Sequence, residues 1–166
     1  MKKILRIGIS SCLLGNLVRW NGEDAGDRRL IETLGLHADW VPVCPEVESG
    51  FGVPRESMQL AGATEAPRLV TTRTGKDHTD RMLNWARGRV RDLEKEDLSG
   101  FIFKESSPSC GLTGVKVFDE KGRFIRNGVG LFARVFMDHF PMLPVEEDGR
   151  LHDLVILKRF MDRISP

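Results

Sequence analysis

The chain has 166 residues, of which 40% are hydrophobic and 30% are charged, and its formal net charge is +1. This composition is typical of one soluble globular domain with a buried core. The near-zero net charge argues against a global electric field that recruits nucleic acid or a membrane surface. No apolar run approaches the ~18 residues that a membrane span needs. We therefore expect a single cytoplasmic domain over residues 1–166.

Short apolar runs and helical periodicity alternate along the first half of the chain. Apolar residues predict a buried strand over Lys3–Ser10, polar starters followed by leucines predict a helix over Asp24–Leu34, and Asp39–Cys44 predicts a second strand. The Gly- and Pro-rich segment Glu48–Ala66 is expected to be a long ordered loop. Apolar residues near the helical period predict a long helix over Thr79–Leu93.

The same alternation continues through the second half. The expected elements are a strand over Leu98–Lys104, a hairpin of Val115–Phe118 and Arg123–Arg126, a helix over Gly130–His139, a short strand within Pro141–Val145 and a helix over Leu151–Ile164. Strands that alternate with helices predict an α/β fold. We expect a three-layer sandwich around a mostly parallel sheet, with a small β-hairpin and the functional site at the C-terminal ends of the strands.

Three cysteines are the first candidates for a functional site. An odd number excludes a closed set of disulfides within one chain. Cys12 follows the first predicted strand, Cys44 closes the second, and Cys110 follows the strand that ends at Lys104. Free cysteines are often no more than buried small apolar residues. The shared position after strands instead favours one common site in the crevice outside the strand ends.

The ligand chemistry of three thiolates narrows what such a site would bind. Structural zinc sites usually have four ligands, often in Cys-x-x-Cys hooks, and this sequence has no such hook. A zinc site with three cysteines and one histidine is an alternative. None of the four histidines, however, lies at a ligand-like spacing from a cysteine. These are His37, His78, His139 and His152. Cysteine thiolates also hold iron–sulfur clusters, and three of them leave one iron of a 4Fe–4S cluster open as a Lewis acid for sulfur.

Two polar residues next to the cysteines are candidate catalytic groups. Glu46 lies two residues after Cys44 and can serve as a general base, or it is a solvated loop carboxylate. Ser107 lies three residues before Cys110 and can hydrogen-bond a substrate or a catalytic water, or it is a turn residue. Glu48 is the second choice for the base.

A further set of residues is predicted to contact the substrate. Ser11 lies beside the first cysteine, Lys104 ends a strand and can favour a developing anion, and Arg55 can pair with a carbonyl or phosphate oxygen. Arg19 and Trp20 are candidates on the substrate side too, because Trp20 can stack on a planar ring. Each of these residues has a plain alternative as a surface or packing group.

The sequence around the cysteines resembles one bacterial protein family. The matching segments read ISSCLLG over Ile9–Gly15, VCPE over Val43–Glu46, KESSPSCG over Lys104–Gly111, GVGLF over Gly128–Phe132 and LPVEEDGRL over Leu143–Leu151. They are similar to the signature of the 2-thiouracil desulfidase family, long catalogued as domain of unknown function 523. The resemblance covers nearly the whole chain and is to the stand-alone form of the family, which also contains longer proteins with a second domain.

The resemblance implies a cofactor and a reaction. It implies a 4Fe–4S cluster held by Cys12, Cys44 and Cys110, and removal of sulfur from 2-thiouracil or 4-thiouracil compounds to give the oxo base and hydrogen sulfide. Glu46 and Ser107 then match the catalytic carboxylate and hydroxyl. The hypothetical mechanism has the open iron bind the substrate sulfur, Glu46 activate water and Ser107 assist, with no net redox change.

Other classes of function remain open at this stage. The chain can be a metal- or sulfide-binding module without catalysis, or a metal-free enzyme with a cysteine nucleophile, which needs a nearby base. An RNA-binding role is suggested by Arg81, Arg87, Arg89 and Arg91, but the acidic residues among them are typical of a solvated helix face. A thiolated pyrimidine is therefore the expected partner, and the sequence gives no oligomeric state.

Overall fold

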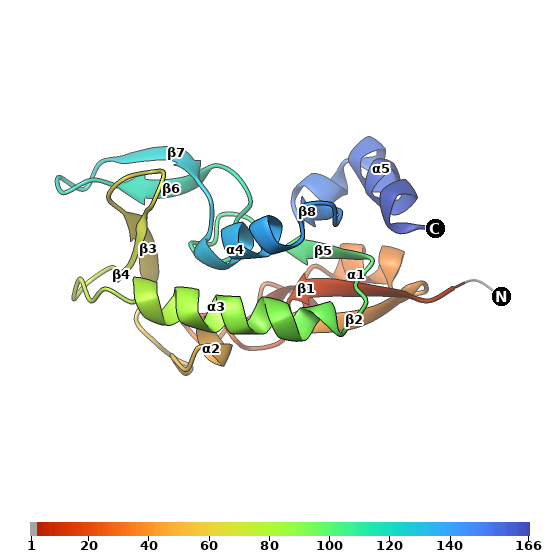
Figure 1. Cartoon of the computed structure of the whole chain (residues 1–166), viewed down its shortest axis with the longest axis horizontal. Coiled ribbons are helices and arrows are strands. Elements are labelled where there is room, and N and C mark those ends of the chain that lie inside the picture. Colours follow the sequence, from red (N-terminus) through yellow and green to blue (C-terminus); the bar gives the residue numbers. More distant parts are fainter. Residues whose placement is uncertain (1–2) are drawn as a thin grey trace.

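A computed structural model describes residues 3–166 and contains two four-stranded β-sheets with helices around them (Figure 1). The strands of the first sheet run in the order β2-β1-β5-β8, and every neighbouring pair is parallel. Their bounds are Leu5–Ser10 for β1, Ala38–Val43 for β2, Gly100–Phe103 for β5 and Val145–Glu147 for β8. This is the mostly parallel sheet that the alternating pattern predicts.

Helices cover both faces of the first sheet, which makes the predicted three-layer α/β sandwich. On one face lie α1 and α5, and on the other lie α3 and α4. The bounds are Arg28–Leu34 for α1, Leu154–Ile164 for α5, Thr79–Glu94 for α3 and Leu131–His139 for α4. The strands are buried on both sides, so β1 and β5 have near-continuous apolar sequences.

The face under α3 and α4 is packed with aromatic rings. Phe101 and Phe103 of β5 stack with centroids 4.2 Å apart, and Phe132 and Phe136 of α4 lie against both of them. The ring of Phe101 also lies over Gly8 of the neighbouring strand. A side chain at Gly8 would occupy the volume of that ring.

The second sheet confirms one expectation and corrects another. Its strands run in the order β4-β3-β6-β7, with bounds Arg68–Thr71, Met58–Ala61, Val115–Phe118 and Phe124–Gly128. The predicted hairpin is present as β6 and β7, and it forms half of this sheet because β3 pairs with β6 in parallel. The expected loop over Glu48–Ala66 is wrong where β3 begins, since Met58 and Leu60 alternate inward as in a strand.

Capping residues explain why two helices begin later than predicted. Asp27 accepts a hydrogen bond from the backbone N–H of Leu30, so α1 begins at Arg28. Asp153 likewise accepts from the backbone N–H groups of Val155 and Ile156 at the start of α5. The last strand is also displaced, since β8 begins at the residue where the predicted strand ended.

Strand order places a crevice at one end of the first sheet. The chain leaves β1 for β2 on one side, and β5 lies on the other side of β1, so the loops after these strands diverge between β1 and β5. In open parallel sheets such a point is the usual position of a functional site. The second sheet lies beyond these carboxyl ends (Figure 1). No helix in the described part of the chain is long and apolar enough to cross a membrane.

We expect Gly8→Ala to lower the free energy of unfolding by about 2 kcal/mol, because overpacked cores lose stability. A Cβ atom at Gly8 would lie 2.2 Å from the ring of Phe101. Urea unfolding measures the change. The matched control is Gly88→Ala, at an exposed position in α3 where a Cβ meets no atom within 4 Å. This control should gain up to about 1 kcal/mol, because alanine favours helix, and equal stability of both variants would contradict the packing.

Candidate metal centre and active site

Three loops bring the three cysteines to the wall of one cavity of about 290 Å³. Cys12 lies in the short 3-10 helix η1, Ser11–Leu14, directly after β1. Cys44 lies between β2 and the first residue of α2, Pro45–Glu48. Cys110 is buried in the loop that joins β5 to β6. Residues distant in sequence therefore meet at the carboxyl ends of three parallel strands.

The cavity wall also contains the other predicted catalytic and substrate-contact residues, apart from Glu48. It consists of residues 10–12, 18–20, 43–46 and 104–108, together with Arg55, Ser57, Met58 and Cys110. Glu46, Ser107, Ser11 and Lys104 all belong to these segments. Ser57 and Met58 come from the start of the second sheet, so that sheet closes the side of the crevice facing away from β1.

Burial disfavours the charged form of all three thiols, and repulsion between the cysteines adds to this at Cys12 and Cys110. Burial raises the pKa of Cys12 from 9.0 to about 11, and the neighbouring Cys44 also raises it, while Lys104 and Arg19 lower it. Burial also raises the pKa of Cys110, to which Cys12 and Cys44 both contribute. Burial raises the pKa of Cys44 as well, although hydrogen bonds from the backbone N–H groups of Val47 and Glu46 lower it in part. Three thiolates here require a compensating cationic group.

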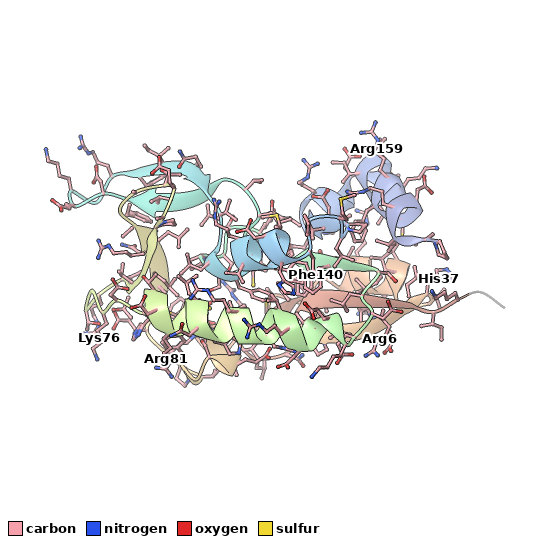
Figure 2. The ribbon with its side chains drawn as sticks, in the orientation of Figure 1. Arg6, His37, Lys76, Arg81, Phe140 and Arg159 are labelled. Carbon is pink, nitrogen blue, oxygen red and sulfur yellow. The ribbon has the colours of Figure 1, made fainter. Side chains whose placement is uncertain are left out.

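The donor set on this wall fits an iron–sulfur cluster. The histidines lie elsewhere: His139 contacts Glu94, His152 contacts Asp27, His78 packs on Phe51, and His37 lies near the amino end of the molecule (Figure 2). Across residues 3–166, no three His, Cys, Asp or Glu side chains converge as they would on a single ion. The sulfur donors on the cavity wall are the three thiols, and thiolates are the ligands of iron–sulfur clusters.

The Glu46 side chain, 16% exposed, faces the cavity with both carboxylate oxygens bound. Arg55 donates from Nε to Oε1 at 3.3 Å, and Ser109 donates from Oγ to Oε2 at 3.4 Å. Pro45 at the first position of α2 fixes the backbone that carries Glu46. The predicted base therefore lies at the cysteine site with a defined orientation.

Arg55 joins two loops of the cavity to Glu46. Its side chain is 7% exposed, and it donates to the carbonyl oxygens of Gly52 at 2.9 Å and Val18 at 2.8 Å. Its backbone N–H donates to the carbonyl oxygen of Trp20 at 2.8 Å. Arg55 therefore links the loop of Val18 and Trp20 to the loop after α2. Its predicted contact with a substrate stays a prediction.

Glu48, the second choice for the base, has a different role. Its Oε2 accepts from the backbone N–H of Cys44 at 2.7 Å, and its Oε1 accepts from Nε of Arg89 on α3 at 2.9 Å. One carboxylate oxygen thus caps the start of α2 and the other ties α2 to α3, and Glu48 is not among the residues of the cavity wall. It fixes the backbone of a cysteine instead.

Ser107 organises the turn that carries Cys110. Its Oγ accepts from the backbone N–H groups of Ser109 at 3.2 Å and Cys110 at 3.0 Å, and its carbonyl oxygen accepts from Gly111. The preceding Ser106 adopts a positive φ of 62°, which is uncommon for a residue other than glycine. Because the oxygen of Ser107 already accepts twice, the hydroxyl proton is the group left to act in the cavity.

The structure separates the roles of the neighbouring polar groups. Ser10 accepts from the backbone N–H of Lys104 at 2.9 Å, and its hydroxyl holds the pKa of Cys110 below the value that burial alone would give. Ser11 accepts from Nδ2 of Asn16 at 2.8 Å. The ammonium of Lys104 lies 3.6 Å from Asp148, so its charge is partly balanced within the protein.

Sequence reasoning missed three supporting groups. Ser109 is fully buried against Glu46, although the sequence alone could not separate it from the other serines of its loop. Glu147 accepts from the backbone N–H of Leu112, and Asp148 accepts from that of Glu105. These partners lie 35 and 43 residues away in sequence, so no local signal could have identified them.

Comparison with known proteins agrees with this site. A family model described as 2-thiouracil desulfurase matches residues 7–148. The chain belongs to this family. The matched segment includes all three cysteines and both candidate catalytic residues.

Two known proteins are similar to this chain. The chain is 34% identical over 108 residues to YbbK, an uncharacterized protein of Bacillus subtilis (strain 168). The aligned segment covers 62% of this chain and 71% of YbbK. It also resembles the solved structure of the 4Fe-4S-dependent thiouracil desulfidase TudS, with a TM-score of 0.71 and 27% identity, over 93% of this chain and 98% of that one. The likeness to TudS supports the α/β fold and the family assignment together.

The raised thiol pKa values predict slow alkylation in the metal-free protein. With a pKa of about 11, Cys12 is roughly 0.1% thiolate at pH 8, so its rate should rise about tenfold per pH unit beyond pH 9. Iodoacetamide labelling followed by peptide mass spectrometry measures this rate between pH 7 and 10. A peptide of residues 11–15 is the control and should level off near pH 9. A plateau at the same pH for Cys12 in the folded protein would contradict its burial.

Proposed function

We propose that this protein removes sulfur from thiolated uracil compounds of the 2-thiouracil or 4-thiouracil type. One observation carries the proposal: the three thiols, Glu46 and Ser107 line the same cavity. The family assignment and the similarity to TudS support the same substrate class. The reaction exchanges the thiocarbonyl sulfur for the oxygen of water and releases hydrogen sulfide, with no net redox change.

Cys12, Cys44 and Cys110 would hold a 4Fe–4S cluster within the single domain of residues 1–166. When bound, a cluster with one iron free of protein ligands supplies a Lewis acid that favours soft sulfur. The protein contributes the ordered loops and the backbone N–H groups at Cys44 that offset thiolate charge. The hydroxyl of Ser10 does the same at Cys110.

Glu46 is the proton acceptor in this proposal. Its carboxylate faces the cavity and takes a proton from the attacking water, which then adds its oxygen to the ring carbon. The carboxylate has lone pairs beyond those used by Arg55 and Ser109, so it can accept this further bond.

Ser107 and Lys104 complete the polar side of the cavity. Ser107 is limited to donating its hydroxyl proton, so it orients the water or a ring heteroatom of the substrate rather than acting as a base. Lys104 and Arg19 place positive charge near Cys12, where a developing anion gains most from it. Ser11, Lys104 and Arg55 remain the proposed substrate contacts.

A reducing compartment suits this chemistry. Cysteines that hold an iron–sulfur cluster must stay reduced, and disulfides are rare in the cytosol. A cytoplasmic location therefore accompanies the proposal. The partner is a small thiolated pyrimidine, and nothing in the charge distribution of the sequence calls for nucleic acid or membrane.

We expect each of the variants Cys12→Ser, Cys44→Ser and Cys110→Ser to lose bound iron, because each removes one thiolate ligand. Anaerobically prepared wild-type protein should carry about four iron atoms and a broad visible absorption band. Iron and sulfide assays measure the loading, and far-ultraviolet circular dichroism checks that the variants remain folded. A colourless, iron-free wild-type protein that still desulfurates thiouracil would favour a cysteine nucleophile instead. A loaded but inactive protein would favour a binding module.

We expect Glu46→Gln to lower kcat by about 10²- to 10⁴-fold while the cluster absorption is unchanged, because the amide cannot accept a proton from water. Turnover is followed by loss of the thiocarbonyl absorption together with sulfide release. The control is Glu32→Gln on α1, whose carboxylate pairs with Arg28 at the surface, and it should match the wild type. Undiminished turnover by the Glu46→Gln variant would remove Glu46 from the mechanism.

A further inference from the structure

The carboxylate of Glu46 is held by side chains from two different loops. Arg55, in the loop after α2, binds Oε1 at 3.3 Å, and Ser109, in the loop of Cys110, binds Oε2 at 3.4 Å. A carboxylate bound at one oxygen can still rotate about its terminal bond. Bound at both oxygens, it has one orientation in which its remaining lone pairs are available to the cavity.

Ser109 is itself fixed in place. Ser109 is fully buried. Its backbone N–H donates to Oγ of Ser107, and its carbonyl oxygen accepts from the backbone N–H of Ala133 on α4 at 3.1 Å. The nearby Gly130 allows α4 to begin this close, because a Cβ there would lie 2.5 Å from the backbone of Ser109. The hydroxyl of Ser109 therefore reaches Glu46 from a rigid backbone.

Arg55 is equally constrained. Its two terminal nitrogens donate to the carbonyl oxygens of Gly52 and Val18, which fixes the plane of the guanidinium and aims Nε at Glu46. The guanidinium side chain is also largely buried, at 7% exposed, and lies directly against the carboxylate. Both supports of Glu46 thus belong to ordered backbone.

We propose that Ser109 is a positioning residue that, together with Arg55, fixes the Glu46 carboxylate in the orientation needed to accept a proton from water. This inference rests on the proposed function, in which Glu46 is the base. Proton transfer requires the acceptor at hydrogen-bond distance and in the correct direction, so a freely rotating carboxylate is productive for only part of the time. Ser109 directly precedes Cys110 in sequence, so the same loop would order both a metal ligand and the base.

The test is a double-mutant cycle between Ser109→Ala and Glu46→Asp. Ser109→Ala in the wild type should lower kcat, expressed per iron-loaded chain, by about tenfold and change the KM for thiouracil by less than about twofold. Aspartate is one methylene shorter, so its carboxylate withdraws from the hydroxyl of Ser109. In the Glu46→Asp background, Ser109→Ala should therefore change kcat by less than about twofold.

Ser49→Ala is the matched control. Ser49 Oγ also bonds to Glu46, but to its backbone carbonyl oxygen, at 3.2 Å. Removing this hydroxyl leaves the carboxylate contacts in place, so kcat should stay within about twofold of the wild type. A tenfold loss in this variant would show that any hydroxyl near α2 matters and would overturn the specific role of Ser109.

Three further results would overturn the proposal. They are wild-type kcat for Ser109→Ala, a tenfold loss that persists in the Glu46→Asp background, and failure of Ser109→Ala to load iron, which would assign Ser109 to the loop of Cys110 alone. Failure of the proposed function has a different signature, because the loaded wild-type protein would then not turn over any thiouracil.

Discussion

Three buried thiols that share one wall are the constraint on which the rest of this site depends. Burial raises the pKa values of all three thiols, and repulsion between the cysteines adds to this at Cys12 and Cys110, so the folded protein disfavours three thiolates without a cationic partner. Ordered elements nevertheless hold all three in place: the 3-10 helix η1 carries Cys12, the start of α2 follows Cys44, and the turn of Ser107 carries Cys110. The proposed core of iron and sulfide would resolve this conflict, since it would add positive charge directly at the three sulfur atoms.

The polar half of the cavity follows from the same arrangement. Each loop that carries a cysteine also carries or supports a polar group: Glu46 follows Cys44, Ser107 and Ser109 precede Cys110, and Ser10 precedes Cys12. Cross-loop hydrogen bonds then tie these groups together, so that ligand positions and the orientation of the carboxylate are set by one network. The second sheet and the loop of Arg55 close the remaining side.

Local patterns predicted most of the secondary structure, and their failures have identifiable causes. The helix α3 and the strand β5 have periodicity or apolar runs long enough to be recognised. The strands β3 and β4 have four residues each and lie among glycines, prolines and polar residues, so their apolar pattern is too short to stand out. They exist because β3 pairs with β6, more than fifty residues later in the chain.

By itself the sequence determined the α/β class, the position of each cysteine after a strand, and the neighbouring Glu46 and Ser107, because these depend on residue type and spacing along the chain. Only the tertiary structure decided that Glu48 turns to Arg89 while Glu46 faces the cavity, and that Ser109 and Arg55 hold its two oxygens. The physical reason is that a hydrogen bond depends on distance and direction between side chains from different loops. Those quantities are fixed when the loops pack together, and no local run of sequence contains them.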